Sequence, residues 1–321
     1  MKKIAILTGG DSAEYDISIL SANTVLQHLN PELFKGYIIH LKNNKFTALV
    51  NNKEIAINKS DFTFRLDNKL ISFDAVFMAL HGTPAENGLI QPYFDKLNIP
   101  YTSCNASVSA LTFDKYLCNN KLSALGFNCA QSYIYEKGNK IDIEKIIKVV
   151  GLPCFVKPNG AGSSNGISKV KQESDLITAI NHALEHDTKV LIEQFINGTE
   201  ISVGVFFNGK SIKALPITEI VSENEFFDYQ AKYEGKSEEI TPARISKERT
   251  TETQNTTIEI YKAMELSGIC RIDYIIMKQQ AYIIEINTIP GLSEESIIPQ
   301  QIKAANLKLS AIFETCLLNT K

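Results

Sequence analysis

The sequence predicts an α/β protein, with a parallel sheet in the first third of the chain and mixed α+β lobes in the rest. Over residues 3–101, apolar strands alternate with segments of helical spacing, which is the pattern of a parallel sheet. Later strands follow one another across short polar or glycine-rich segments, as antiparallel pairs do. At 321 residues, the chain is long enough for two or three domains.

The first domain is expected to end near Tyr101. Three apolar strands are predicted in it, at residues 3–8 and in the segments FKGYIIHL and FDAVFMALHG. Helical spacing predicts two helices, in the segments DISILSANTVLQHL and LIQPYFDKLN. Pro92 lies in the first turn of the second helix, where proline is tolerated.

The middle of the chain is predicted to form a separate α+β lobe. A long helix is expected over Ser107–Leu125, closed by Gly126. In LPCFVKPNGAGSSNGISKV, two strands flank a turn rich in glycine and serine, which indicates a hairpin. The segment SDLITAINHALEHD follows as a helix.

The last part of the chain is rich in strands, predicted in KVLIEQFI, TEISVGVFFNG, 270–277 and 281–287. A helix is expected around 247–267, ending at Gly268. Residues 228–243 are polar and irregular, and they are too long for a simple turn. Such loops are often active-site lids.

The composition is that of a soluble globular protein, with 44% hydrophobic and 21% charged residues. A net charge of −3 gives no support for a nucleic-acid partner. The apolar run at the N-terminus is too short for a secretory signal, and no stretch approaches the roughly 18 apolar residues of a membrane span. The six cysteines are scattered without a C-x-x-C pair, which argues against a zinc site. We therefore expect a cytoplasmic protein with small-molecule partners and with buried, unpaired cysteines.

A possible metal site lies on the last two strands. Arg271 and Asp273 share one strand face, as do Glu285 and Asn287, because side chains two apart point the same way. If the KQQ segment joins these strands as a hairpin, the carboxylates and the amide converge. Such oxygen ligands suit Mg²⁺. The alternative is an ion-pair patch on a solvated sheet face, and the abrupt NTIPG turn beside the ligands favours the metal site.

The segment VKPNGAGSSNGISKV is a possible anion site. Its turn carries glycines and two serines, Ser163 and Ser164, and free backbone N–H groups in such a turn can hold phosphate oxygens. Lys157 on the preceding strand could reach the same anion. The segment matches neither a P-loop nor a dinucleotide-binding fingerprint. The alternative is an ordinary hairpin loop.

Polar residues at other strand ends are weaker signals. Glu193 ends one strand and Glu200 begins the next, where backbone groups could read an adenine and a carboxylate could bind ribose hydroxyls. The alternative is a pair of solvated strand-end glutamates. Glu14 follows the first strand, and His81 with Glu86 follows another, at the sheet edge where ligands gather. For His81, the alternative is a hydrogen-bonded histidine in the core.

Together these segments resemble the ATP-grasp enzymes, and within them the D-alanine–D-alanine ligase family. The likeness spans nearly the whole chain in order, through GGDSAEYDIS, HGTPAENG, FDK, VKPNGAGSSNG, IEQFINGTE, DYQAKY, RIDY and EINTIPGLSEES. Each motif is modest alone, but the ordered set is highly specific. The resemblance implies three domains, at 1–103, 104–189 and 190–321, with ATP between the last two.

The resemblance also implies roles for individual residues. The ATP-binding set would be Lys115, Lys157, Ser164, Glu193, Gln194, Phe195, Ile196, Glu200 and Lys232. Two Mg²⁺ ions, with Mn²⁺ able to substitute, would be held by Asp273, Glu285 and Asn287. Arg271 and the backbone N–H of Gly291 match groups that stabilise an oxyanion.

The substrate site implied by the resemblance draws on all three domains. Glu14, Ser163 and Tyr233 match a hydrogen-bonded trio that joins them. The other substrate-binding residues would be His81, Glu86, Ser296 and Ile297, and Ser296 would take the carboxylate of the second substrate.

Two departures from the family pattern concern the substrate site. In the motif H-G-x-x-G-E-D-G, Ala85 replaces a glycine and Asn87 an aspartate, which leaves the conformation of that loop open. In GLSEES, Glu294 and Glu295 lie beside the expected carboxylate site, where they would repel an anion unless they point outward.

The activity implied is ATP-dependent joining of two D-alanines through an acylphosphate, for peptidoglycan precursors, by a homodimer. One rival is a ligase that joins D-alanine to D-lactate, or another ATP-grasp carboxylate–amine ligase, but AKY in the lid favours D-alanine twice. The other rival is a nucleotide-binding regulatory protein without turnover. The retained metal ligands and Arg271 argue against it.

Overall fold

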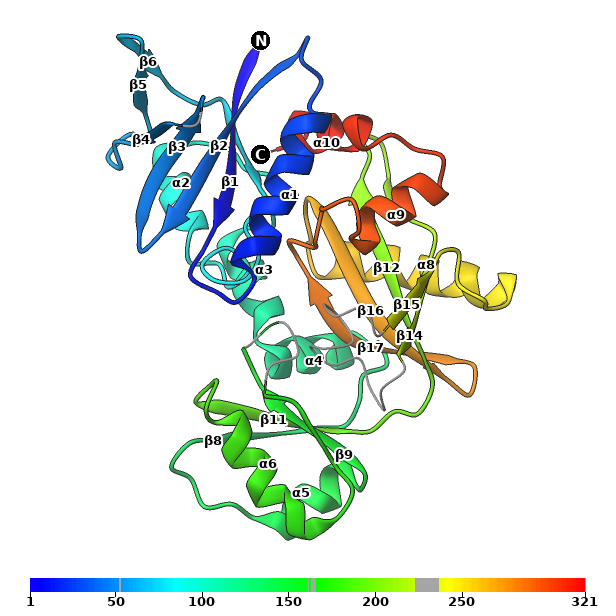
Figure 1. Cartoon of the computed structure of the whole chain (residues 1–321). Coiled ribbons are helices and arrows are strands. Elements are labelled where there is room, and N and C mark those ends of the chain that lie inside the picture. The colour runs from blue at the N-terminus through cyan, green and yellow to red at the C-terminus, as the bar shows by residue number, and fades with distance from the viewer. Residues whose placement is uncertain (52, 161, 163–165, 223–236, 321) are drawn as a thin grey trace.

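The computed structural model describes residues 1–51, 53–160, 162, 166–222 and 237–320. Figure 1 shows the first sheet and α1 at one end, the middle lobe at the other, and the C-terminal strands and helices beside both. Within the described ranges, no helix combines the length and the apolar character that a membrane crossing requires.

The first sheet has the strand order β4-β3-β2-β1-β7. Its strands are β1 (Lys2–Gly9), β2 (Phe34–Lys42), β3 (Lys45–Val50), β4 (Lys53–Ala56) and β7 (Ala75–Met78). β1 runs parallel to both β2 and β7, which confirms the parallel sheet predicted for these three strands. β3 pairs antiparallel with β2 and β4 pairs antiparallel with β3, and neither strand was predicted. A small hairpin of β5 (Phe64–Leu66) and β6 (Lys69–Ile71) stands apart.

Helices link and cover this sheet. α1 (Tyr15–His28) joins β1 to β2, and α2 (Gln91–Leu97) carries Pro92 in its first turn as predicted. The predicted long helix over 107–125 is wrong, because it is two helices, α3 (Ala106–Phe113) and α4 (Lys115–Ala124). Asp114 leaves helical geometry between them (φ −78°, ψ 96°) and its side chain accepts a hydrogen bond from the N–H of Leu117. An aspartate that caps a new helix start in this way ends the preceding helix.

The middle lobe is an antiparallel sheet covered by two helices. Its strands, in the order β10-β9-β11-β8, are β8 (Ser132–Glu136), β9 (Cys154–Pro158), β10 (Ser168–Val170) and β11 (Lys189–Gln194). The β9–β10 pairing confirms the predicted hairpin. The helical elements are α5 (Ile143–Val150), the 3₁₀ turn η1 (Glu173–Asp175) and α6 (Leu176–Ala183). β11 belongs to this sheet by hydrogen bonding, whereas the three-domain division itself stays a prediction.

The C-terminal part is an antiparallel sheet in the order β15-β14-β12-β16-β17, with β13 also paired to β12. Its strands are β12 (Thr199–Phe207), β13 (Ile212–Ala214), β14 (Thr218–Ser222), β15 (Ser237–Ile240), β16 (Ile269–Met277) and β17 (Gln280–Asn287). Its helices are α8 (Lys247–Ala263), α9 (Ile297–Ala304) and α10 (Leu309–Leu318). In the segment predicted as an irregular lid over 228–243, residues 237–240 form β15, and residues 228–236 lie outside the described part of the chain. α8 ends sooner than predicted, and Glu265 and Gly268 follow it with positive φ.

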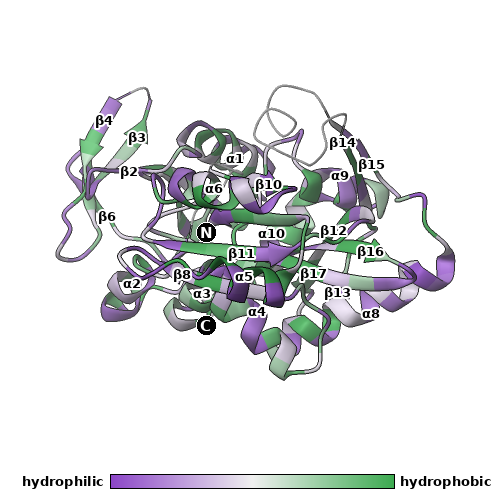
Figure 2. Cartoon of the chain, turned by 90° about the horizontal axis from the view of Figure 1, so that it is seen from below, coloured by the Kyte–Doolittle hydropathy of each residue, from purple (hydrophilic) through white to green (hydrophobic). Residues whose placement is uncertain are grey.

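The cores distinguish the parts of the molecule. Figure 2 shows hydrophobic residues along β11 and β12 and hydrophilic residues at one end of α8. One core joins the first sheet and α1 to α9 and α10, and another joins α3, α4 and α8 to the C-terminal sheet. The middle lobe has a core of its own. All six cysteines are unpaired as predicted, and all but the half-buried Cys129 are buried.

Candidate active site

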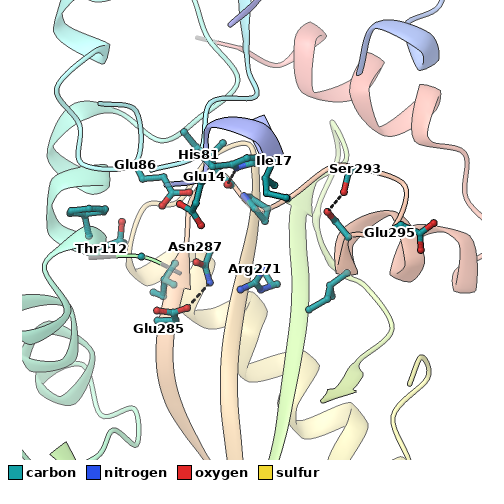
Figure 3. Close-up of a pocket in the computed structure, with 18 of the residues that line it drawn as sticks. Glu14, Ile17, His81, Glu86, Thr112, Arg271, Glu285, Asn287, Ser293 and Glu295 are labelled. Atoms are coloured by element: carbon teal, nitrogen blue, oxygen red, sulfur yellow. Dashed lines mark hydrogen bonds between the residues drawn. The ribbon is translucent and has the colours of Figure 1, made fainter. Parts of the chain in front are cut away.

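A cavity of about 220 Å³ lies where α1, the β16–β17 hairpin and the start of α9 face one another. The predicted site residues that line it are Glu14, His81, Glu86, Lys115, Arg271, Glu285, Asn287, Gly291, Ser296 and Ile297. In Figure 3, Glu14, His81 and Glu86 point into the cavity from one side, and Glu285, Asn287 and Arg271 face them from the strands. Residues distant in sequence therefore form a single site.

The β16–β17 hairpin brings its polar residues together as the sequence predicted. Asp273 lies opposite Glu285, and Arg271 opposite Asn287, in the antiparallel register. The amide Nδ2 of Asn287 donates to Asp273 Oδ2 at 2.9 Å and lies 3.5 Å from Glu285 Oε1. These side chains form a cluster of two carboxylates and one amide, in which Glu285 and Asn287 line the cavity and Asp273 lies outside its lining.

The carboxylate–amide cluster fits a hard divalent cation. Mg²⁺ prefers carboxylate and amide oxygens and keeps several waters, so it needs few protein ligands. Asn287 presents its nitrogen to the carboxylates here, but a half-turn of the amide would present its oxygen instead. The side chains of Asp273, Glu285 and Asn287 could therefore hold the ion between them.

Arg271 is fixed as a cation beside this cluster. Its Nε and Nη2 donate to the two oxygens of Asp273 at 2.8 and 2.7 Å, and Ser202 Oγ donates to the same carboxylate at 2.5 Å. Burial alone would lower the pKa of Arg271, but the charge and hydrogen bonds of Asp273 outweigh it and raise that pKa. Glu285 and Glu239 raise it further. The side chains of Arg271 and Asp273 are only 12% and 8% exposed, so the alternative of a solvated ion-pair patch is wrong.

Lys115 enters the site at the start of α4, where Asp114 breaks the helix. Its Nζ lies 3.9 Å from Glu285 Oε2. Asn159, just before the glycine-rich turn, accepts hydrogen bonds from the N–H of Tyr116 on its side chain and from the N–H of Lys115 on its carbonyl. The break in the helix thus ties a lysine near the cluster to the edge of the middle lobe.

Lys157 lies in the middle lobe and is paired with Glu193. Their side chains are 9% and 8% exposed, and Nζ lies 2.5 Å from Oε2. Asn119 on α4 donates to the other oxygen of Glu193 at 2.8 Å. The alternative of a solvated strand-end glutamate is therefore wrong for Glu193. Gln194, Phe195, Ile196 and Glu200 lie at the end of β11 and the start of β12, outside the lining of the cavity.

His81 is buried and hydrogen-bonded through both ring nitrogens, as the core-histidine reading expects, yet it also lines the cavity. Nδ1 lies 2.7 Å from the carbonyl of Ile289 and Nε2 lies 2.8 Å from Ser21 Oγ. The N–H of Leu292 donates to the same Ser21 hydroxyl at 3.0 Å. A carbonyl oxygen can only accept, so Nδ1 donates to Ile289. Through the His81 ring, α1 holds the 289–292 turn in place.

The turn that His81 holds presents Gly291 to the start of α9. A Cβ at position 291 would lie 2.7 Å from Ser296 Oγ, so a larger residue there would push the Ser296 side chain aside. Ser293 Oγ and Ser296 Oγ are 2.7 Å apart. Ser296 is the N-cap of α9 and Ile297 its first residue. Backbone N–H groups at a helix N-terminus attract anions, so this end of the cavity suits a carboxylate.

Comparison with known proteins agrees with this geometry. The family model for the D-ala D-ala ligase N-terminus matches residues 3–104, and that for the D-ala D-ala ligase C-terminus matches residues 122–318. The D-alanine–D-alanine ligase of Flavobacterium johnsoniae is 49% identical over 98% of this chain and 97% of its own length. The chain belongs to the D-alanine–D-alanine ligase family.

Solved structures of related ligases share the whole architecture, an ATP-grasp fold. The VanG D-Ala:D-Ser ligase of Enterococcus faecalis has a TM-score of 0.87 and 30% identity, over 98% of each chain. The D-alanine–D-alanine ligase of Bacillus anthracis, solved in complex with ATP, has a TM-score of 0.81 and 25% identity over 99% of this chain and 97% of its own. The family is therefore one of ATP-using ligases.

The departures from the D-alanine–D-alanine ligase pattern are accommodated. Gly82 and Gly88 have positive φ, of 69° and 80°, whereas Ala85 lies outside that region and needs no glycine. Ala85 is buried and its carbonyl accepts a hydrogen bond from Gln91 Nε2 at 2.7 Å. Asn87 Nδ2 donates to Thr83 Oγ1 at 3.1 Å. The loop is therefore closed by hydrogen bonds of its own.

The second departure is the pair of glutamates in GLSEES, of which one lines the cavity. Glu294 and Glu295 are both exposed, and Glu295 lines the cavity. In Figure 3 the Glu295 side chain points away from Glu285 and Asn287. Its charge is thus directed away from the carboxylate–amide cluster.

Some residues of this ligase site were missed from the sequence. Glu239 on β15 lines the cavity, and its Oε2 accepts a hydrogen bond from Gln300 Nε2 at 2.8 Å. Glu239 was missed because its segment was predicted to be irregular rather than a strand. Other lining residues were given no role, namely Ile17, Thr112, Phe113, Ile289 and Ser293, although all but Thr112 lie within the quoted motifs. Four predicted residues, Ser163, Ser164, Lys232 and Tyr233, lie outside the described part of the chain.

Proposed function

We propose that this chain joins two D-alanines to D-alanyl-D-alanine, with ATP converted to ADP and phosphate. The observation that carries the proposal is the convergence in one cavity of the carboxylate–amide cluster, Arg271 and the Gly291 turn, facing Glu14 and His81. Membership of the ligase family supports the same reaction.

In the first step, the carboxylate of one D-alanine attacks the γ-phosphate of ATP. Both reactants are anions, so cationic groups must offset their repulsion. We propose that Lys115 and Lys157 hold phosphate oxygens, with Lys232 as a further contact. Mg²⁺ held by Asp273, Glu285 and Asn287 would supply additional positive charge at the phosphates.

In the second step, the amine of the other D-alanine attacks the acylphosphate, and phosphate leaves. The tetrahedral intermediate carries an oxyanion. Arg271, kept cationic by Asp273, and the backbone N–H of Gly291 are suited to stabilise that charge. Ser296 and the start of α9 would receive the carboxylate of the incoming amino acid, whose negative charge matches a helix N-terminus.

Glu14 is suited to the ammonium group of the first D-alanine. It is the N-cap residue of α1, lines the cavity and lies close to Gly162, where a Cβ would be 3.3 Å from its Oε2. An α-amino acid keeps its charge in a closed site only with a compensating anion. We propose that Ser163 and Tyr233 act with Glu14 here, as the resemblance implies.

The remaining expectations are proposals of the same kind. We propose domains at 1–103, 104–189 and 190–321, a homodimer as the resemblance implies, and a cytoplasmic location that fits the unpaired cysteines. Light scattering of the purified chain tests the dimer.

A coupled ADP-release assay tests the reaction. We expect release with ATP plus D-alanine, little with L-alanine, and none with ATP alone, since a regulatory nucleotide-binding protein would not turn over. D-lactate or D-serine added beside D-alanine distinguishes the other ligases, because the mixed product can be identified by mass spectrometry. Equal ADP release with and without D-alanine would contradict the proposal.

A further inference from the structure

Three side chains with metal-binding atoms meet on the middle lobe, away from the cavity. They are His182, Glu185 and His186, all exposed, and one ligand atom from each lies within 4.8 Å of the others. The N–H of Glu185 donates to the carbonyl of His182 at 3.2 Å, so the chain keeps a helical turn beyond the last residue of α6. Residues three and four apart on such a turn share a face. The sequence H-x-x-E-H therefore presents two imidazoles and a carboxylate together.

The His182–Glu185–His186 cluster lies against both ends of the glycine-rich turn. A Cβ at Gly166 would lie 2.6 Å from Cδ2 of His186, so the ring rests directly on that glycine. Next in the chain, Asp187 Oδ2 accepts a hydrogen bond from the N–H of Gly160 at 2.7 Å. The same short segment thus contacts the two described flanks of the turn.

A third contact bears on the orientation of a ligand. Ser168 Oγ lies 3.4 Å from Nδ1 of His182. A hydrogen-bonding partner on one ring nitrogen of a histidine orients the other toward a metal. Ser168 on β10 can therefore orient one of the two imidazoles of the cluster.

We propose that His182, Glu185 and His186 bind a Zn²⁺ ion, with water completing the coordination. Two imidazoles and one carboxylate, with an open position, are a donor set that zinc uses in proteins. Imidazole ligands favour zinc over Mg²⁺, which prefers oxygen alone. Cysteine spacing gave no sign of zinc, but this site uses none of the cysteines.

Zinc in this site would hold His186 against Gly166 and so restrict the flanks of the glycine-rich turn. If that turn binds the phosphates of ATP, zinc should change the KM for ATP. This second step rests on the proposed function, whereas zinc binding itself does not.

Isothermal titration calorimetry of the full chain with Zn²⁺, in excess Mg²⁺ to occupy oxygen sites, tests the binding. We expect one zinc per chain, and at least about a tenfold weaker affinity in His182→Ala/His186→Ala. His28→Ala is the matched control, because His28 lies at the end of α1, and it should bind as the unaltered chain does. X-ray absorption should show nitrogen and oxygen ligands near about 2.0–2.1 Å. Sulfur ligands, or equal zinc affinity in the double variant, would overturn the site.

A glycine variant tests the site without removing a ligand. Gly166→Ala would push against the His186 ring and should weaken zinc binding. Gly138→Ala is its control, since Gly138 also has a positive φ (95°) but nothing lies within 4 Å of its added Cβ. Unchanged zinc affinity in Gly166→Ala would show that His186 is not a ligand in this position.

The link to the nucleotide is read from the KM for ATP with and without zinc. We expect a shift in the unaltered chain and none in the double histidine variant. Zinc bound at the cluster with an unchanged KM overturns the link but leaves the site. If the unaltered chain binds zinc but releases no ADP from ATP and D-alanine, with or without zinc, that result would count against the proposed function instead.

Discussion

The middle lobe and the rest of the molecule support their parts of the candidate site on different cores. The middle lobe buries its own residues, such as Val156, Ile180 and Ile192, between its sheet and its two helices. The first and last parts of the chain share a core, in which Phe77 of β7 packs on Phe313 of α10. The groups proposed for bond formation thus lie mainly on one joint body, and Lys157 lies on another.

The polar clusters on the two bodies differ in the same way. Lys157 and Glu193 form a closed pair, with both side chains under a tenth exposed. The Glu285 side chain is 32% exposed, and Lys115 Nζ lies 3.9 Å from its Oε2. The middle-lobe pair is already neutralised, as is Asp273 by Arg271, and Glu285 is the more exposed carboxylate of the carboxylate–amide cluster. Substitutions on each side should therefore have different effects.

The largest effect is expected from Glu285→Gln. If Glu285 holds a cation that offsets phosphate charge, its loss should lower kcat by about 10³-fold or more, with the fold unchanged. Steady-state kinetics at ordinary Mg²⁺ measures this. Glu294→Gln removes the same charge from an exposed position and should be neutral. Wild-type kcat in Glu285→Gln would remove Glu285 from the metal site.

Lys157→Met should act on the nucleotide and on the middle lobe. Removing one partner of a buried ion pair costs about 3–5 kcal/mol, because Glu193 keeps an uncompensated charge. A lost charged hydrogen bond to phosphate should raise the KM for ATP about 10- to 100-fold. Denaturant unfolding and kinetics report the two effects. Lys148→Met, on the exposed face of α5, should change neither. An unchanged KM for ATP would place the phosphates elsewhere.

Glu14→Gln tests the junction between the two bodies. It keeps size and hydrogen bonding but removes charge, so the KM for the first D-alanine should rise about 10- to 100-fold, well above any change for the second. Asp16→Asn on the same helix start is exposed and controls for the helix dipole, which is worth about 0.3–1 kcal/mol. If both variants lower only the melting temperature, Glu14 does not bind the ammonium.

Ser21→Ala should loosen the turn that carries Gly291. It removes the hydroxyl that joins the N–H of Leu292 to His81, a loss of about 1 kcal/mol for each hydrogen bond. We expect kcat to fall about 5- to 10-fold, with the KM for ATP unchanged. Thr24→Ala is the control on α1, since that hydroxyl donates to the carbonyl of Leu20 on the same helix. Equal kcat values for the two variants would show that the 289–292 turn does not help to stabilise the oxyanion.

The smallest effect is expected from Glu219→Gln. Hydrogen bonds from Arg244 hold the pKa of Glu219 below its usual range, and the pair joins β14 to the chain after β15. A carboxyl whose pKa is lowered on folding stabilises the protein above its unfolded pKa, and this is lost as pH falls through the folded value. The melting temperature should therefore drop by roughly 2–4 °C at neutral pH. Melting curves across pH should converge in acid, and a difference that persists there would contradict the ion pair.

The sequence was sufficient for the elements that bear the chemistry, since strand periodicity predicted the β16–β17 hairpin and the face shared by Asp273 and Glu285. Local patterns did not reveal the break at Asp114, because an aspartate inside a helical pattern can be a surface residue or a cap. They also did not reveal β15 or Glu239, whose strand forms only by pairing with β14. Pairing partners distant in sequence decide such elements.

The role of His81 shows the same limit. Motif and burial each suggested one reading, a substrate contact or a core residue. The structure joins Ser21, His81 and Ile289 through space, over more than 200 residues of sequence between the last two. A motif can name such a residue, but only packing shows that it holds the turn beside the cavity.

Nucleotide affinity without Mg²⁺ tests the division between the two bodies most directly. We would measure the Kd of ADP, in chelator, for the unaltered chain, Glu285→Gln and Lys157→Met. The account predicts that Glu285→Gln keeps the unaltered Kd while having lost turnover, and that Lys157→Met weakens it about tenfold or more. Weaker ADP binding in Glu285→Gln, with an unchanged Kd in Lys157→Met, would contradict the assignment of chemistry to the joint body and of nucleotide binding to the middle lobe.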